Sequence, residues 1–181
     1  MGEKRRVRGA FILLSTLVVL SLVGCLFGPV RYRGVKSYRD GQVFIRHGKS
    51  YQIGTLPEGW RGLDTRARVI AFYHPELRST IFTDAFCGSA FEDVQSKDLL
   101  GRMALGLEHV RILEESPVEL DGRGGHMKRL TANVDGVAHE LRLVTVKKGG
   151  CVFDFAAVSP LSPAPQVAHD FEIFYRGFHY E

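Results

Sequence analysis

The chain has 181 residues, with 24 Lys and Arg against 20 Asp and Glu, and a sequence pI of about 9.1. Four of the basic residues and one acidic residue precede Ala10, so the rest of the chain is nearly neutral, with 20 basic and 19 acidic side chains. Proteins that bind nucleic acid usually carry a marked basic excess on the folded domain. We therefore expect no nucleic-acid partner.

The N-terminal segment has the layout of a secretory signal. A basic start is followed by an apolar run from Ala10 to Gly24, which we expect to be helical and which ends at Leu22-Val23-Gly24-Cys25. This segment resembles the signal peptide and lipobox of bacterial lipoproteins. The resemblance implies that residues 1–24 are removed and that Cys25 carries lipid, palmitate included. The alternative is an uncleaved membrane anchor, although about 18 apolar residues are marginal for a span.

Both alternatives place the rest of the chain outside the cytoplasm, because the basic flank stays inside. The residue after Cys25 is Leu26. By resemblance to lipoprotein sorting in enteric bacteria, a residue other than Asp here favours the periplasmic face of the outer membrane over the inner membrane. We expect the membrane, through the lipid, and an envelope protein as partners.

The rest of the sequence predicts one domain behind a tether. We assign residues 25–48 to the lipidated cysteine and the tether, with Val43–Ile45 as a candidate first strand, and residues 49–181 to a single domain. No Pro/Ser-rich linker and no internal repeat divides this part of the sequence. Its length is normal for one domain.

Two cysteines, Cys87 and Cys151, remain if lipid takes Cys25. Exported domains fold in an oxidising compartment, where an even number of cysteines usually forms disulfides. We therefore predict a Cys87–Cys151 disulfide. The alternative is two buried free thiols.

The first half of the domain predicts short strands and a helix. Strands are expected at Tyr51–Ile53, Arg68–Tyr73 and Ser79–Thr83, with a turn at Pro57–Trp60 after the first of them. A helix is expected from Lys97 to about Arg111. Ser96 is its expected N-cap, and its apolar stripe consists of Leu99, Met103, Leu107 and Val110.

The second half predicts a meander of strands and a final helix. A strand is expected at Ile112–Leu120 and a loop at Asp121–Gly125. Asp135-Gly136 between alternating apolar runs favours a type I′ hairpin, and Lys147–Gly150 is expected to form another turn. The next strand should point Cys151, Phe153, Phe155 and Ala157 inward. The last helix should begin at Ser162 and Pro163 and bury Val167, Phe171, Phe174 and Phe178.

These elements predict an α+β fold with a largely antiparallel sheet and two main amphipathic helices packed on it, after the N-terminal signal helix. The arrangement over Lys49 to Tyr180 resembles the PsbP-like α/β/α sandwich. The resemblance rests on the element order, the Pro57–Trp60 start and the terminal amphipathic helix. It implies a binding or assembly role and provides no family site residues.

Motifs that suggest catalysis or cofactors are incomplete. Cys87–Phe91 is similar to a segment of papain-like proteases, but Ala90 stands where their nucleophile would be. The glycines near Gly124 lack the Lys and Ser/Thr of a phosphate-binding loop. His126, His139 and His169 form no close ligand pair, so we predict neither a metal site nor a cofactor.

The sequence is compatible with three functions. The leading hypothesis is a lipid-anchored, non-catalytic envelope domain that binds a partner or supports an assembly. The second is an envelope enzyme with a site assembled from distant residues, such as Asp154 with His139 or His126. The third is a carrier of a small ligand, which would need a deep apolar pocket.

Overall fold

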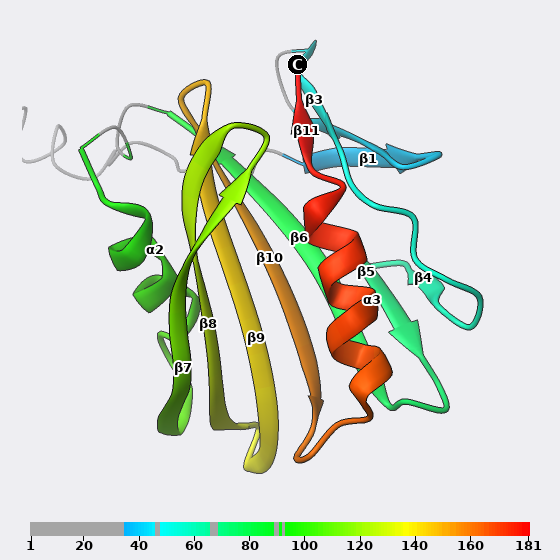
Figure 1. Ribbon diagram of the computed structural model, residues 1–181. Helices are drawn as coiled ribbons and strands as arrows, with labels where there is room; N and C mark the ends of the chain where they lie inside the picture. The colour runs from blue at the N-terminus through cyan, green and yellow to red at the C-terminus, as the bar shows by residue number, and fades with distance from the viewer. Residues whose placement is uncertain (1–34, 46–47, 66–68, 89–90, 92) are drawn as a thin grey trace, which may run out of the picture. The chain divides into compact units, whose positions relative to one another are not determined.

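A long antiparallel sheet forms the centre of the part of the chain that the structure describes (Figure 1). Its seven strands are β4 (Arg61–Leu63), β5 (Ile70–His74), β6 (Ser79–Cys87), β7 (Glu108–Leu120), β8 (Arg123–Val134), β9 (Val137–Lys148) and β10 (Cys151–Pro160). They lie side by side in the order β4-β5-β6-β10-β9-β8-β7. The strand that closes the meander, β10, therefore lies between β6 and β9 in the middle of the sheet.

This computed structural model describes residues 35–45, 48–65, 69–88, 91 and 93–181. The predicted signal helix, the lipobox Leu22–Gly24 and Cys25 lie outside the described residues. No helix within the described part has the length and apolar character that crossing a membrane requires.

A second, smaller sheet and two helices complete the fold. The small sheet has the order β1-β2-β3-β11. Its strands are β1 (Val35–Arg39), β2 (Gln42–Ile45), β3 (Ser50–Gln52) and β11 (His179–Tyr180). Helix α2 (Ser96–Met103) packs on one face of the long sheet, whereas α3 (Pro165–Arg176) and the small sheet pack on the other. The predicted α+β class, with two helices packed on antiparallel sheet, is confirmed.

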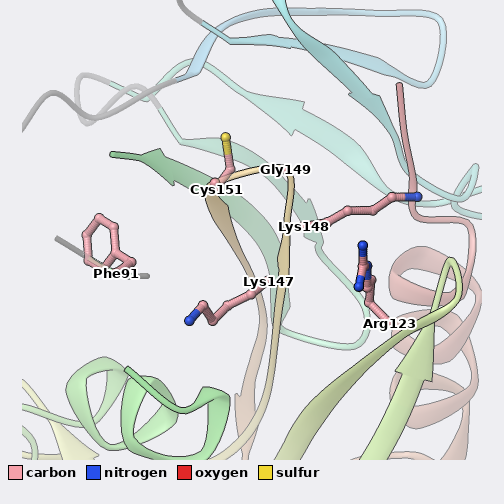
Figure 2. A pocket seen from close by; sticks show the side chains of 7 residues that line it. Phe91, Arg123, Lys147, Lys148, Gly149 and Cys151 are labelled. Carbon is pink, nitrogen blue, oxygen red and sulfur yellow. The ribbon is translucent and has the colours of Figure 1, made fainter. Parts of the chain in front are cut away.

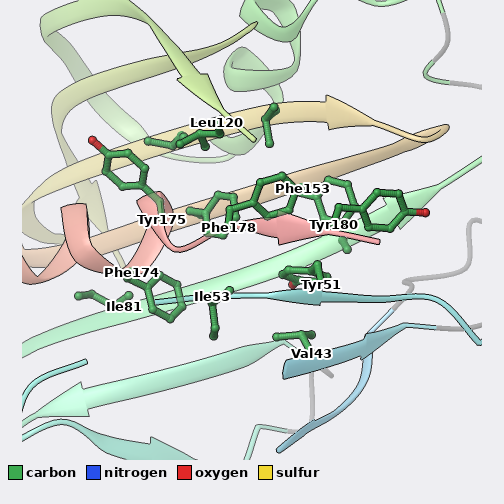
Figure 3. Packing of buried hydrophobic residues seen from close by; sticks show 14 of the residues in the cluster. Val43, Tyr51, Ile53, Ile81, Leu120, Phe153, Phe174, Tyr175, Phe178 and Tyr180 are labelled. Carbon is green, nitrogen blue, oxygen red and sulfur yellow. The ribbon is translucent and has the colours of Figure 1, made fainter. Parts of the chain in front are cut away.

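The main core lies between the long sheet and α3. Phe153 and Phe155 of β10 are fully buried, and Phe153 contacts Phe178 with ring centroids 4.8 Å apart. Tyr51 from the small sheet packs edge-on against Phe153, at 5.0 Å between centroids (Figure 3). The alternation predicted for this strand is therefore confirmed. Val167, Phe171 and Phe174 of the predicted helical stripe are buried on α3, and Phe178 is buried just after the helix ends at Arg176.

The opposite face of the sheet carries a smaller apolar cluster beneath α2. Leu100 of this helix is fully buried against Leu130, Leu141, Leu143 and Ala156. Strand β10 thus buries side chains on both of its faces. Its near-continuous apolar sequence has the composition expected of a central strand.

The structure corrects several predicted boundaries. Strands β1 and β2 lie within residues 25–48, so the folded part begins before the predicted domain start at Lys49; Val43 and Ile45 belong to the main core. The first helix ends at Met103 instead of about Arg111, because the chain from Glu108 onward pairs with β8. Its N-cap is Gln95, not Ser96.

Two further boundaries move by a few residues. The predicted loop after β7 shrinks to a turn at Asp121–Gly122, since Arg123 already pairs with Leu120. The last helix begins at Pro165 with Ala164 as its N-cap, two residues after the predicted start. The predicted hairpin at Asp135-Gly136 is present, and both residues have positive φ, of 50° and 78°.

We expect the Phe153→Ala substitution to lower the free energy of unfolding by about 3–5 kcal/mol, because it leaves a cavity at the contact of three core elements. Urea denaturation followed by circular dichroism measures this loss. The matched control is Val137→Ala, since Val137 is 59% exposed and its truncation should change stability by less than about 0.5 kcal/mol. Equal losses in both variants would contradict the assigned core.

Candidate functional site

A disulfide joins the ends of the two strands at the centre of the long sheet. Cys87 is the last residue of β6 and Cys151 the first residue of β10, and the two are direct partners in the antiparallel register. Their sulfur atoms are bonded, so the predicted pairing is confirmed in the structure. The bond fixes the end of the sheet at which β9 turns into β10.

The turn between β9 and β10 consists of Gly149 and Gly150, which have φ values of 58° and 74°. A Cβ atom on Gly149 would lie 2.4 Å from a ring carbon of Tyr180, so only glycine lets this ring pack on the turn. The amide of Gly88 donates a hydrogen bond to the carbonyl of Gly150 at 3.1 Å. The turn is therefore contacted by Gly88, the residue after Cys87, and by Tyr180 of the C-terminal strand.

A pocket of about 250 Å³ opens beside this turn. The first residues that pair between β8 and β9 at this end are Gly125 and Val146. The ends of the two strands beyond this pair therefore leave a gap in the sheet. The residues that line the pocket are Phe91, Arg123, Lys147, Lys148, Gly149, Gly150 and Cys151. Arg123 and Lys148 extend to one side of the turn, whereas Lys147 and Phe91 lie on the other (Figure 2).

The pocket wall contains three cationic side chains and no carboxylate. The Nζ atom of Lys147 donates to the carbonyl of Val94 at 2.7 Å, and Lys148 pairs with Asp121. Arg123 is exposed and has no side-chain partner among the residues that the structure describes. Its guanidinium group is therefore available to a ligand.

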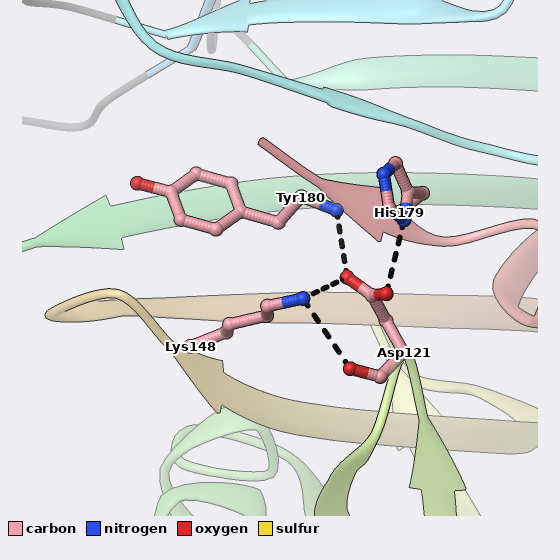
Figure 4. A network of polar contacts seen from close by, with 4 residues as sticks. All are labelled: Asp121, Lys148, His179 and Tyr180. Carbon is pink, nitrogen blue, oxygen red and sulfur yellow. Dashed lines mark hydrogen bonds and ion pairs between the residues drawn. The ribbon is translucent and has the colours of Figure 1, made fainter.

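Asp121 ties the C-terminal strand to the hairpin of β7 and β8 (Figure 4). Its carboxylate accepts hydrogen bonds from Lys148, from the Tyr180 amide at 2.9 Å and from His179 Nδ1, also at 2.9 Å. Burial by itself would raise the pKa of this carboxyl group, but the three donors outweigh it and lower the pKa to about 2. Asp121 therefore stays ionised and neutralises Lys148 rather than Arg123.

A second polar feature crosses the face of the sheet that α2 covers. His126, Thr145, Asp154 and Asp84 are successive register partners on β8, β9, β10 and β6. The hydroxyl of Thr145 donates to Asp154. Burial, and next the neighbouring charge of Asp84, raise the pKa of Asp154 to about 7, although Thr145 and Arg102 act in the opposite direction.

The structure thus brings Asp154 and His126 into one row, but not into contact. Strand β9 lies between them, and two strand spacings amount to about 10 Å. The buried Nδ1 atom of His126 has no hydrogen-bond partner within the described part of the chain. His139 lies far from this row, opposite Pro160 at the other end of β10, and its ring contacts the carbonyl of Val137.

Metal-ligating side chains do not gather elsewhere in the described ranges. No group of three or more His, Cys, Asp or Glu residues is placed to hold a metal ion among them. His169 lies on α3, whereas His126 and His139 lie on β8 and β9. The described residues therefore hold no built metal centre.

Reasoning from the sequence missed the three cations of the pocket. Lys147 and Lys148 stood out only as part of a turn, and Arg123 as part of a loop. The usable signal was that basic residues flank glycine turns in two hairpins, at Asp121–Gly122 and Gly149–Gly150. Sequence alone does not bring those two turns to the same end of a sheet.

Comparison with known proteins identifies the fold but no family. The sequence matches no family model and no curated protein. Cyanobacterial PsbP (CyanoP) from Synechocystis superposes with a TM-score of 0.54 at 16% identity, over 86% of this chain and 97% of that one. LpqN, involved in cell envelope biogenesis of Mycobacterium tuberculosis, superposes with a TM-score of 0.53 at 17% identity, over 74% and 87% of the two chains.

A third similar structure comes from Bacteroides thetaiotaomicron, with a TM-score of 0.54 and 16% identity. The match covers 83% of this chain but only 49% of the other, so this chain spans about half the length of that protein. Identities this low relate the folds only. The predicted resemblance to the PsbP-like fold is supported.

Removal of the disulfide should destabilise the domain. The bond closes a loop with a sequence separation of 64, for which the chain-entropy argument gives about 4 kcal/mol. We expect the Cys87→Ala/Cys151→Ala variant to lose stability by this order in urea denaturation. Dithiothreitol should lower the midpoint of the unchanged protein and leave that of the variant where it is. An unchanged protein insensitive to dithiothreitol would contradict the bond.

Asp154 should make stability fall as the pH rises from about 4 to 7. In this range the folded chain holds a proton on Asp154 that the unfolded chain releases, so the free energy of unfolding decreases by up to about 1.4 kcal/mol per pH unit. Asp154→Asn should remove this part of the slope in urea denaturation. The control is Asp121→Asn, because the lowered pKa of Asp121 affects the slope only below about pH 4. Parallel slopes for Asp154→Asn and the unchanged protein between pH 4 and 7 would refute the shift.

Proposed function

We propose that this chain is a lipid-anchored cell-envelope protein whose domain binds a partner without catalysing a reaction. The basic start, the apolar run and the lipobox ending at Cys25 support the anchor. The Cys87–Cys151 disulfide fits an oxidising compartment. The likeness in fold to LpqN, described as involved in cell envelope biogenesis, agrees with a place in the envelope. Leu26 after Cys25 favours the outer membrane.

The pocket beside the β9–β10 turn is the observation that supports a binding role. Three cations line it without an acid, so it suits an anionic group and offers no paired acid and base. Sites for drug-sized molecules have volumes of about 300–1,000 Å³. A pocket of about 250 Å³ is suited to one charged group of a larger partner.

An envelope enzyme remains the second candidate. Two observations favour it: the pKa of Asp154 near 7 and the unpartnered Nδ1 of His126 in the same row. However, neither residue lines the pocket, and the Asp154 carboxylate is occupied by the Thr145 hydroxyl. A carrier of a small apolar ligand is less suited to the domain, because aromatic side chains pack the space between α3 and the sheet.

Metabolic labelling with radioactive palmitate in a bacterial host tests the anchor. We expect the chain to take up label, and Cys25→Ser to abolish the label and leave a precursor of higher mass, because the signal peptidase needs the lipid-modified cysteine. The matched control is Ser21→Ala, which changes a neighbouring residue outside the lipobox and should keep both label and processing. Label and size unchanged in Cys25→Ser would refute the lipid anchor.

A further inference from the structure

The pocket lies at the end of the domain where the described chain begins. Val35, the first described residue, is the register partner of Ile45, and the Ile45 amide bonds to the carbonyl of Lys49. The Nζ atom of Lys49 in turn donates to the carbonyl of Gly149 in the pocket wall, at 3.4 Å. Three successive contacts therefore connect the start of the domain to the β9–β10 turn.

The chain between Cys25 and Val35 is short. It comprises nine residues, 26–34, so the Cα atoms of Cys25 and Val35 are ten residue steps apart, at most about 35 Å when the chain is fully extended. If Cys25 carries the lipid, as proposed above, the start of β1 cannot move further than this from the membrane surface. The pocket, close to that start, is then held within reach of the lipid headgroups.

The charges at this end suit a phosphate group. Arg123 offers an exposed guanidinium fork in the pocket wall, the geometry that binds phosphate oxygens in a bidentate manner. Asp121, whose turn precedes Arg123, is already engaged by Lys148, His179 and the Tyr180 amide. Asp121 therefore does not neutralise Arg123.

The other side of the pocket is aromatic. Phe91 lines it, and the guanidinium group of Arg102 lies over the Phe91 ring, 5.4 Å from its centroid. Aromatic side chains beside basic ones are typical of surfaces that meet a membrane interface, because the ring contacts the acyl boundary while cations contact the phosphates. The pocket combines both kinds of group.

We propose that this pocket binds the phosphate of an anionic lipid headgroup in the membrane to which Cys25 anchors the chain. The inference rests on the proposed lipid anchor and adds the ligand class and the orientation of the domain. The lipid supplies attachment, and the pocket turns the β9–β10 end toward the surface. Free inorganic phosphate has the same chemistry, so the two sources need separate measurements.

Vesicle co-sedimentation of the chain from residue 25 onward, with Cys25→Ser, tests the proposal. The protein carries no lipid, so binding reports on the domain and does not depend on whether Cys25 is modified. We expect binding to vesicles of phosphatidylcholine with 30% phosphatidylglycerol, weaker binding at high salt, and little binding to phosphatidylcholine alone. Arg123→Gln should weaken binding to the anionic vesicles about fivefold, since one basic residue near a surface contributes about that factor.

The matched control is Arg111→Gln, which removes the same charge from an exposed position near the far end of β7. It should change binding by less than about twofold. Both variants should keep the unfolding midpoint of the parent, because both side chains are exposed. Equal weakening by the two variants would show attraction by net charge alone and would overturn the assigned pocket.

Calorimetric titration with inorganic phosphate separates the two sources. Weak, millimolar binding that Arg123→Gln reduces, together with Arg123-dependent vesicle binding, supports a headgroup site. Phosphate binding without any preference for anionic vesicles would assign the pocket to a soluble anion and overturn the membrane orientation. The palmitate experiment can fail separately from this one. A chain that takes up no palmitate but prefers anionic vesicles would refute the lipid anchor only. A chain that takes up palmitate but shows no preference for anionic vesicles would refute only the headgroup site.

Discussion

The register of β10 between β6 and β9 is the constraint on which the rest of the fold depends. One face of this strand carries Phe153 and Phe155 into the aromatic core, and the other carries Asp154 and Ala156 toward α2. A slip by one residue would exchange these two faces, bury the carboxyl group among aromatic rings and expose the rings. The Cys87–Cys151 bond joins direct register partners at the first residue of β10. It therefore prevents a register slip between β6 and β10 at this end of the pair.

The sequence predicted those parts of the fold that follow from local periodicity. The alternation of Cys151–Ala157 and the apolar spacing from Val167 to Phe178 each determine which side chains face the core. Asp135-Gly136 favours a hairpin turn through its own backbone preferences. The disulfide followed from the compartment and an even number of cysteines. In each case the determining interaction lies within a few residues or in the environment of the chain.

The sequence failed where distant pairing decides the structure. Strand β7 is an edge strand, and most of its residues are exposed on both faces, so it has no alternation to distinguish Glu108–Arg111 from a helix. Strand β2 is short, and its Val43 and Ile45 pack in a core that also includes Phe153 and Phe178, more than a hundred positions later. The pocket is the extreme case, because its cations come from two hairpin turns that meet only after β8 and β9 have paired.

The two polar features of the domain differ in what their environment lets them do. On the α2 face, burial keeps Asp154 partly protonated near neutral pH, and its neighbours satisfy it, so the row mainly affects stability. At the β9–β10 end, three hydrogen-bond donors lower the pKa of Asp121, which forms an ion pair with Lys148. Arg123 therefore remains unneutralised in an open pocket. A charge that is accessible and unpaired can gain interaction energy from a ligand, whereas a buried charge already satisfied can only lose it. The cationic end is therefore the better place for recognition, and the disulfide beside it provides the rigidity that a preformed site requires.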